Sequence, residues 1–278
     1  MHRPEDKDRG AVTSYKVIMF SFDKIKSPAI MGIVNVTPDS FSDGGEHFKS
    51  ENAVDFALQL IDDGADIIDL GAQSTRPGYT EITPDEEIKR LSGVLPKLRK
   101  KTEKPISVDT YFTKVAQWAV DNGADIINDV SGTFDMAGVV KNSGAGWVIM
   151  HSGSGSVDEV RAFFAEMAAK CADFGIDKKQ ICFDMGIGFG KTYEQNLELI
   201  ANVSAYKLPD YPLLLGTSRK RVIGTASHTD NVQKRIYGNI AADTAAILGG
   251  VDIIRLHDVK NEIKGIMTAK AITESRLQ

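Results

Sequence analysis

The sequence predicts a single (β/α)₈ TIM barrel preceded by a short N-terminal hairpin. Eight short apolar runs alternate with eight helical patterns, and this alternation implies parallel strands. The runs are apolar almost throughout, as expected for strands covered on both faces. The count of eight, the regular spacing and an internal repeat favour a closed barrel over an open doubly wound sheet, which alternation alone also allows.

The predicted strands are short runs that are rich in β-branched residues. They lie near residues 30–34, 67–70, 106–108, 126–127, 147–150, 181–183, 213–215 and 253–256. The predicted helices lie between them, at 53–63, 84–100, 113–122, 136–143, 157–174, 193–203, 234–248 and 261–276. Thr83 followed by Pro84 is typical of a helix start, since threonine caps the helix and proline suits its first position.

The chain is expected to form one domain, because no low-complexity linker interrupts the pattern. We expect a disordered polar tail over residues 1–14, a hairpin within 15–26, and a barrel domain over 15–278. The polar start does not resemble a secretory signal, and no apolar run approaches the ~20 residues that cross a bilayer. Two cysteines, with no disulfide pattern, suit the cytoplasm. The net charge of -5 argues against a broad nucleic-acid-binding surface.

A repeated phrase, Gly-x-Asp-Ile-Ile, begins at Gly64, Gly123 and Gly250. Its glycine can end a helix, and its apolar pair is too short for a helix but suits a buried strand. The residue that follows the phrase differs between the copies, being Asp69, Asn128 or Arg255. The repeat therefore indicates scaffold, and the variable residue is where chemistry is expected.

Polar residues stand at the carboxyl end of all eight predicted strands, the end at which barrel enzymes place their sites. These residues are Asn35, Asp69, Asp109, Asn128, His151, Asp184, the cluster at 218–220, and Arg255 with His257. Any single polar strand end is explained by contact with water. Eight that converge on one rim point to a binding site.

The loops after the first two strands carry groups suited to an anionic ligand. Asn35 opens a long glycine-containing loop and can offer an amide oxygen to a hard cation or its water shell, or else simply cap the strand. Ser74–Gly78 places Arg76 and two hydroxyls in a proline-stiffened loop. This loop is either a phosphate clamp or an ordinary surface turn.

Asp109, Asn128 and Asp184 form a carboxylate, amide and carboxylate set on three strands. Such a set matches the donor and acceptor edge of a flat nitrogen heterocycle. Buried acids imply a ligand, a metal or an arginine partner. A metal is the weaker interpretation, because no His/Cys cluster accompanies the acids.

The stretch 184–192 is neither a P-loop nor a dinucleotide fingerprint. Met185 stands where the P-loop needs its first glycine, and the glycine spacing does not fit G-x-G-x-x-G. What it offers is a backbone that can approach a ligand closely, with Phe189 able to pack on that ligand. The basic residues at 218–221 and at 255–258 follow strands seven and eight, the usual phosphate site of this fold. Lys220 can bind an anion or form a Schiff base, and its basic neighbours favour binding.

In order along the chain, these segments resemble dihydropteroate synthase, a family of folate-pathway enzymes. The resemblance covers about residues 28–272 and rests on seven motifs: MGIVNVTPDSFSDGG, STRPG, SVDT, IND, GIGFGK, SRK and RLHD. It implies a barrel that joins 6-hydroxymethyl-7,8-dihydropterin diphosphate to 4-aminobenzoate and releases pyrophosphate. It also implies Mg²⁺ as cofactor, a homodimer, and no nucleic-acid or membrane partner.

The resemblance also assigns site residues. It places Asp109, Asn128, Asp184 and Lys220 on the pterin ring, with Ile127, Met150 and Phe189 lining the pocket. Asn35, Arg255 and His257 are implied to hold the diphosphate and its Mg²⁺. The aminobenzoate pocket is implied to contain Phe41, Thr75, Arg76, Pro77 and Ser218. Asp109, Asp184, Lys220 and Arg255 are the implied catalytic residues, and Asp69 is expected to support the loop at 75–76.

The chain departs from the family pattern at four positions. Gln73 stands where glutamate is usual, Ala72 where glycine is common, Met185 where proline is usual and Ser152 where methionine is usual. Loss of the glutamate charge bears on the mobile loop and on aminobenzoate affinity. Three other functions are possible for such a chain: a pterin-binding methyltransferase, a non-catalytic paralogue, and an aldolase that uses Lys220. The anion-binding motifs argue against the methyltransferase.

Overall fold

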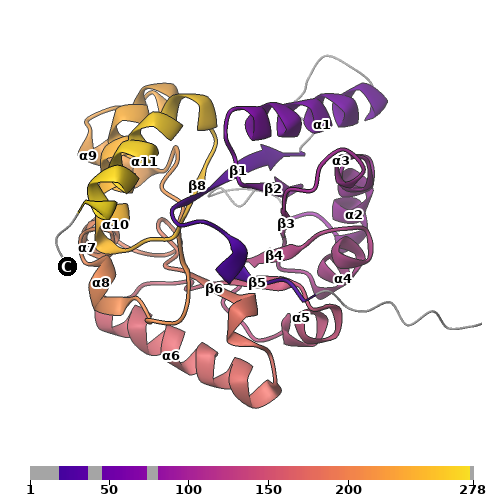
Figure 1. Ribbon diagram of the computed structural model, residues 1–278, viewed down its shortest axis with the longest axis horizontal. Helices are drawn as coiled ribbons and strands as arrows, with labels where there is room; N and C mark the ends of the chain where they lie inside the picture. Colours follow the sequence, from indigo (N-terminus) through magenta and orange to yellow (C-terminus); the bar gives the residue numbers. More distant parts are fainter. Residues whose placement is uncertain (1–18, 37–45, 74–80, 276–278) are drawn as a thin grey trace, which may run out of the picture.

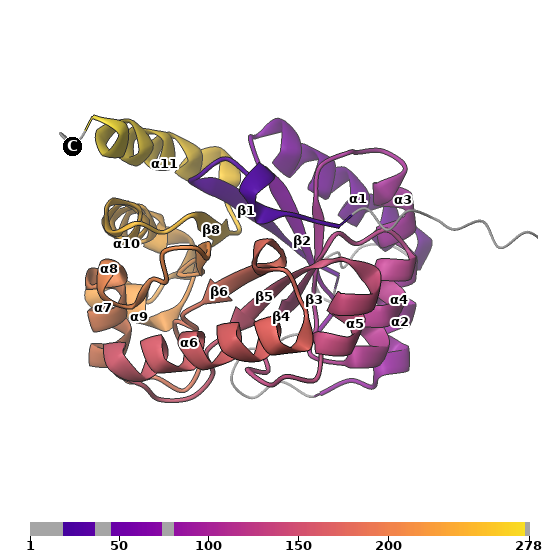
Figure 2. The same ribbon diagram turned by 60° about the horizontal axis from the view of Figure 1, so that its bottom comes forward.

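The computed structural model of the protein describes residues 19–36, 46–73 and 81–275. Within them eight parallel strands pair in chain order, and pairing of the last with the first closes a barrel. Helices surround the strands on the outside, as the two views in Figure 1 and Figure 2 show. The predicted (β/α)₈ barrel is therefore confirmed over an open sheet.

All eight predicted strands are present. They span Ala29–Asn35 (β1), Ile67–Gly71 (β2), Ile106–Asp109 (β3), Ile126–Asp129 (β4), Gly146–Met150 (β5), Ile181–Asp184 (β6), Leu213–Leu215 (β7) and Ile253–Leu256 (β8). Several run one or two residues further than predicted at the carboxyl end. Asn35, Asp109 and Asp184 are therefore the last residues of strands rather than loop residues.

The helices follow the predicted order with two divisions. The α-helices are Glu46–Asp62 (α1), Pro84–Ser92 (α2), Leu95–Arg99 (α3), Thr113–Asp121 (α4), Ala137–Ser143 (α5), Val157–Phe174 (α6), Tyr193–Ala201 (α7), Val203–Tyr206 (α8), Arg221–Ala226 (α9), Ile236–Gly249 (α10) and Val259–Glu274 (α11). The predicted helix 84–100 is two helices, and the predicted helix 193–203 ends at Ala201 before a second short helix. The short helix α9 was not predicted.

The predicted N-terminal hairpin is wrong for its described part. Residues 19–26 contain the 3₁₀-helix Phe22–Lys24 and no strand. Phe22 is buried among residues that face the barrel interior, and a Cβ on Gly146, the first residue of β5, would meet the Phe20 and Phe22 rings. In Figure 1 this indigo segment crosses the barrel opening. It therefore closes the amino-terminal end of the barrel; residues 1–18, including the predicted tail, lie outside the described residues.

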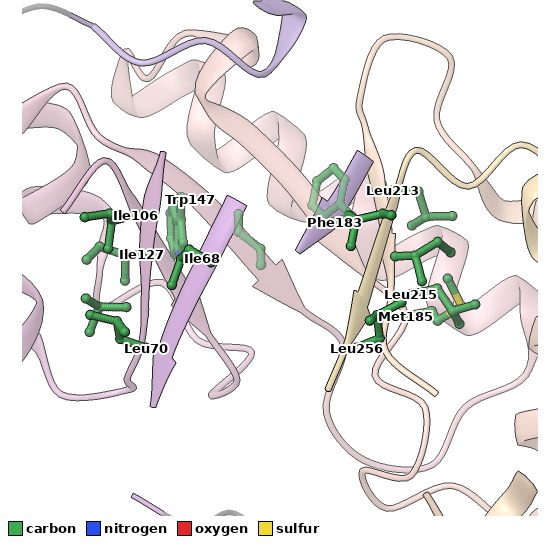
Figure 3. Close-up of a cluster of buried hydrophobic side chains, with 14 of the residues drawn as sticks. Ile68, Leu70, Ile106, Ile127, Trp147, Phe183, Met185, Leu213, Leu215 and Leu256 are labelled. Atoms are coloured by element: carbon green, nitrogen blue, oxygen red, sulfur yellow. The ribbon is translucent and has the colours of Figure 1, made fainter. Parts of the chain in front are cut away.

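Two apolar cores lie on the two faces of the sheet, because successive strand residues point to opposite faces. The larger core lies between sheet and helices and contains residues such as Ile68, Trp147 and Phe183, shown in Figure 3. The smaller core fills the barrel interior. It contains Ala29, Met31, Ile67, Ile126, Val148, Cys182, Leu214 and Ile253 together with Phe22. Among the described residues, no helix has the length and apolar character that a membrane span needs.

The three repeat glycines perform the same task in each copy. Gly64, Gly123 and Gly250 have φ values of 111°, 102° and 109°, which side chains disfavour. The aspartate two residues later binds a backbone N–H at the start of a neighbouring strand. These aspartates are Asp66, Asp125 and Asp252, and they accept from Ile30, Ile106 and Leu213 at 3.1, 2.8 and 2.9 Å. The repeat is scaffold, as predicted.

We expect Asp125→Ala to destabilise the fold by about 1–2 kcal/mol, because two charge-assisted interactions are lost. Asp125 accepts from the Ile106 N–H at 2.8 Å and pairs with Arg99 at 2.8 Å. Urea unfolding measures this change. Asp55→Ala is the control, because its pair with Lys101 is 3.8 Å long and exposed, and its effect should stay within about 0.5 kcal/mol. Equal effects would contradict a clamp at Asp125.

Candidate active site

The polar residues at the carboxyl end form the layer directly above the apolar interior of the barrel. Two residues beyond each interior core position, the strand again faces inward. This rule places a mainly polar set inside the rim: Asp69, Asn128, Met150, Asp184, Gly216 and Arg255. On β1 and β3 the corresponding inward positions at the strand ends are Asn35 and Asp109. The structure thus brings the carboxyl ends of all eight strands to one site.

Arg255 lies between two acids within this layer. Its Nε and Nη2 atoms lie 2.7 and 2.6 Å from Asp69 Oδ2, and Nη2 lies 2.7 Å from Asp109 Oδ2. Burial opposes the charge, but the two carboxylates outweigh burial and raise the pKa of Arg255. Burial raises the pKa of Asp109 to about 7 against the attraction of Arg255. The pair supplies one fixed cation and one carboxyl group that titrates near neutrality.

Asn128 belongs to the same group through Asp69. Its amide nitrogen donates to Asp69 Oδ2 at 3.3 Å. Its carbonyl oxygen Oδ1 is buried and has no hydrogen-bond partner among the described residues. An unpaired buried acceptor costs free energy, so this atom favours a ligand that brings an N–H donor.

Asp184 and Lys220 form the second charged part of the site. Asp184 Oδ1 accepts from the Gly186 N–H at 2.7 Å, and burial raises the pKa of this carboxyl although Lys220 opposes the change. Burial lowers the pKa of Lys220 to about 8. The Lys220 ammonium donates to the Ile187 carbonyl and lies 4.7 Å from the centre of the Phe189 ring. Phe189 therefore lies at the predicted site, as a cation–π partner of Lys220.

Glycine keeps space open beside these groups. A Cβ at Gly216 would lie 3.8 Å from Lys220 Nζ, and a Cβ at Gly71 would lie 4.0 Å from both Asn35 Oδ1 and Asp109 Oδ2. Both glycines occupy inward positions near the ends of strands. A flat ligand can therefore approach the polar layer where side chains would otherwise project.

Ser218 and His257 meet at the ends of β7 and β8. Ser218 Oγ accepts from the His257 backbone N–H at 3.2 Å and lies 3.1 Å from His257 Nδ1. The imidazole of His257 and the hydroxyl of Ser218 thus place polar groups that can donate hydrogen bonds near Arg255, an arrangement that suits an anion.

Ile127 does not line the site. It is fully buried in the core between sheet and helices, while its neighbour Asn128 faces the barrel interior. Adjacent residues of a strand point to opposite faces, so both cannot reach one ligand. This placement contradicts the prediction that Ile127 lines the pocket. Met150 occupies an inward position, in agreement with its predicted location.

Asp69 is fully buried, and among the described residues it binds Arg255 and Asn128. The loop at 75–76, which Asp69 is expected to support, lies outside the described residues. The predicted aminobenzoate residues Phe41, Thr75, Arg76 and Pro77 lie outside the described residues. At the base of that loop, Gln73 accepts from the Ile82 N–H at 2.9 Å and donates to the Tyr111 hydroxyl. Gln73 thus uses both ends of its amide, which a glutamate cannot do.

Lys191 is a site residue that sequence analysis missed. Its ammonium donates to the carbonyls of His151, Gly153 and Gly186 at 3.0, 3.2 and 3.1 Å. It therefore ties the loop after β5 to the loop after β6, in which Gly186 also binds Asp184. The available signal was the lysine that ends GIGFGK.

Two cavities at the opposite end of the barrel are poor candidates. They measure about 460 and 530 Å³ and lie on either side of the segment that closes the amino-terminal end. The lysines of the first are paired with acids: Lys178 with Asp210 at 3.0 Å and Lys207 with Asp252 at 2.7 Å. The positive charges that line the first cavity are thus already paired. At the rim, by contrast, the buried carbonyl oxygen of Asn128 has no hydrogen-bond partner among the described residues.

Comparison with known proteins identifies the family of the chain. Residues 31–257 match the family of pterin binding enzymes. A dihydropteroate synthase of Clostridium beijerinckii is 41% identical over 239 residues, which are 83% of this chain and 88% of the relative.

Two solved structures share the fold along nearly their whole length. A dihydropteroate synthase of Clostridium difficile, solved in the presence of pteroic acid, has a TM-score of 0.85 and 41% identity, covering 90% of this chain and 98% of that one. The Xanthomonas albilineans enzyme with 4-aminobenzoic acid has a TM-score of 0.85 and 37% identity, with coverage of 90% and 94%. The chain belongs to the pterin-binding enzyme family, among its dihydropteroate synthases.

Proposed function

We propose that the protein condenses 6-hydroxymethyl-7,8-dihydropterin diphosphate with 4-aminobenzoate, giving 7,8-dihydropteroate and pyrophosphate. One observation carries the proposal: Asp109, Asn128 and Asp184 lie near the carboxyl ends of three strands inside one rim, beside Lys220 and the anion-binding groups that follow β7 and β8. A nitrogen heterocycle with a diphosphate matches this arrangement of acceptors and cations. A related structure was solved in the presence of pteroic acid, which joins a pterin to 4-aminobenzoate, and another was solved with 4-aminobenzoic acid alone.

In this reaction, the bond between the pterin methylene carbon and a diphosphate oxygen breaks. The aniline nitrogen forms the new bond to that carbon and loses one proton. Asp109 and Asp184 accept ring N–H groups and offset the positive charge that develops on the pterin as the leaving group departs. Arg255 and His257 bind the diphosphate, which gains negative charge. No protein nucleophile is needed, because the leaving group is good once its charge is stabilised.

We propose Mg²⁺ as the cofactor, held by Asn35 together with the diphosphate. The Asn35 amide oxygen lies at the rim beside Gly71, and Mg²⁺ typically keeps several waters with few protein ligands. Among the described residues, no cluster of three His, Cys, Asp or Glu side chains is arranged to bind a metal, which suits an ion carried largely by substrate. When bound, Mg²⁺ stabilises charge on the leaving group.

The aminobenzoate pocket is proposed to form from Ser218 with Phe41, Thr75, Arg76 and Pro77. Ser218 is supported by its place beside His257. For the other four, which lie outside the described residues, the support is the STRPG motif and the first loop of the family pattern.

Release of pyrophosphate tests the proposed function. We expect release only when pterin diphosphate, 4-aminobenzoate and Mg²⁺ are all present, and chelation of the metal should stop it. Binding of pterin diphosphate without release on adding aminobenzoate would instead indicate a non-catalytic paralogue.

The pH profile of kcat/KM should be bell-shaped and narrow. Activity needs Asp109 as a carboxylate, so it should rise through a pKa of about 7, and it needs Lys220 as an ammonium, so it should fall above a pKa of about 8. Lys220→Arg keeps the cation, and the alkaline fall should disappear or move to higher pH. An unchanged fall in that variant would contradict the assignment to Lys220.

We also propose a homodimer in the cytoplasm. Helices α10 and α11 expose Tyr237, Met267 and Ile272, whose surfaces are 82, 52 and 50% accessible. Exposed apolar side chains on two helices that pack together favour an interface. Both cysteines are free and buried, as suits a reducing compartment. Sedimentation velocity tests the dimer, and a monomer at micromolar concentration would exclude it.

A further inference from the structure

Asp69 links two ligand-binding side chains through one oxygen atom. The residue is fully buried at the level of the polar layer. Its Oδ2 atom accepts from Arg255 at 2.7 Å and from the Asn128 amide nitrogen at 3.3 Å. Arg255 and Asn128 are far apart in the sequence, so this oxygen sets their relative positions.

The contact with Asp69 fixes which end of the Asn128 amide faces the pocket. A carboxylate that is paired with a guanidinium can only accept, so the amide nitrogen must point toward it. The carbonyl oxygen of Asn128 then points away from Asp69, and it is buried without a partner among the described residues. Asn128 therefore presents an acceptor, and a ligand at this position must present a donor.

Asp69 also orients the guanidinium of Arg255. Nε and Nη2 both contact Asp69 Oδ2, while Nη2 also reaches Asp109 at 2.7 Å. Two acids on neighbouring strands thus hold the planar group from one side. Without Asp69, Arg255 would lose two of its three carboxylate contacts among the described residues, and its plane would be held less firmly.

We infer that Asp69 is a positioning residue that determines ligand specificity: it orients Asn128 as an acceptor and fixes the plane of Arg255. Asp69 acts through these two residues and needs no ligand contact of its own. The inference rests on the proposed function for the identity of the ligand, a pterin diphosphate. It concerns the pterin half of the reaction alone.

Asp66 provides a matched control. It lies three residues before Asp69 at the amino-terminal end of the barrel, where it accepts from the Ile30 N–H at 3.1 Å and pairs with Lys104 at 3.7 Å. Asp66→Asn makes the same chemical change in the scaffold. It should leave both KM values within twofold of the wild type.

The first test separates positioning from general damage to the fold. Asp69→Asn should raise KM for pterin diphosphate at least tenfold and leave KM for 4-aminobenzoate within twofold, because neither of its partners is assigned to the aminobenzoate. A general defect in folding would change both KM values, or it would lower only the fraction of protein that is active and leave both KM values unchanged. An equal rise in both values would overturn the inference.

The second test is a double-mutant cycle on the affinity for pterin diphosphate, measured by titration calorimetry. In the wild type, Asp69→Asn should raise the dissociation constant at least tenfold. When Asn128 is already alanine, the factor by which Asp69→Asn raises the dissociation constant should be at least five times smaller. Additive effects would overturn the inference. If Asp69→Asn does not fold, a cycle between Arg255→Lys and Asn128→Ala replaces it, since both residues share Asp69 Oδ2 and additivity would exclude a shared anchor.

The two proposals fail in different ways. A wild-type protein that binds pterin diphosphate but releases no pyrophosphate defeats the proposed function, while the calorimetric cycle still decides the role of Asp69. A wild type that turns over, with additive effects in the cycle, defeats the inference alone.

Discussion

Asp184→Asn is expected to lower kcat/KM at least 100-fold, about 2.7 kcal/mol of transition-state stabilisation. Asp184 is buried at the end of β6, and its charge interacts with that of Lys220. Asparagine keeps the shape but loses the charge that offsets the cation forming on the pterin. It also leaves Lys220 buried without this carboxylate. Steady-state kinetics with pterin diphosphate measures the loss.

Asp177→Asn is the matched control for Asp184→Asn. Asp177 lies just before β6 at the other end of the barrel and accepts from the Lys179 N–H at 2.9 Å. Its replacement should leave kcat/KM within twofold. A loss of less than tenfold for Asp184→Asn in a folded protein would contradict a role in holding the pterin.

Arg255→Met is expected to destabilise the fold by about 3–5 kcal/mol, because it leaves Asp69 and Asp109 buried without their cation. Arg255 contacts both acids at 2.7 Å or less, and its side chain is only 19% exposed. Without Arg255, the pKa of Asp109 should rise further, since Arg255 now opposes the effect of burial. The instability should therefore lessen at acid pH, where Asp109 is protonated.

Denaturant unfolding at pH 8 and pH 6 measures both effects of Arg255→Met. Lys114→Met is the control, because its pair with Asp85 is exposed and should contribute less than about 1 kcal/mol. A loss below 1 kcal/mol at pH 8 would show that Asp69 and Asp109 do not depend on the arginine.

The barrel was predictable because its strands form short local patterns. The helix expected over 84–100 is divided after Ser92, and the second helix, α3, carries Pro96 in its first turn. Proline lacks the backbone N–H that a helix interior needs, so Pro96 favours the start of a new helix and its signal was overlooked. The segment 19–26 differs, because its conformation depends on the packing of Phe20 and Phe22 against the end of the barrel interior.

The polar layer was predictable in part, because polar residues stand at the carboxyl ends of the predicted strands. Asp109, Asn128 and Asp184 were predicted from those positions. The alternation of side chains along a strand, which was not applied, would have excluded Ile127. The partners of Asp69 were not predictable, because 186 residues separate it from Arg255. Lys191 was missed because its bonds go to backbone carbonyls, whose positions only the folded loops define.

We expect a pterin to bind at the carboxyl end of the barrel through Asp109, Asn128 and Asp184. A crystal structure of the protein with 6-hydroxymethyl-7,8-dihydropterin diphosphate would show where the ring lies. We predict the ring within hydrogen-bonding distance of all three side chains, with an N–H group facing Asn128 Oδ1. A ring bound at the amino-terminal end, or one that leaves Asn128 Oδ1 unpaired, would contradict the account.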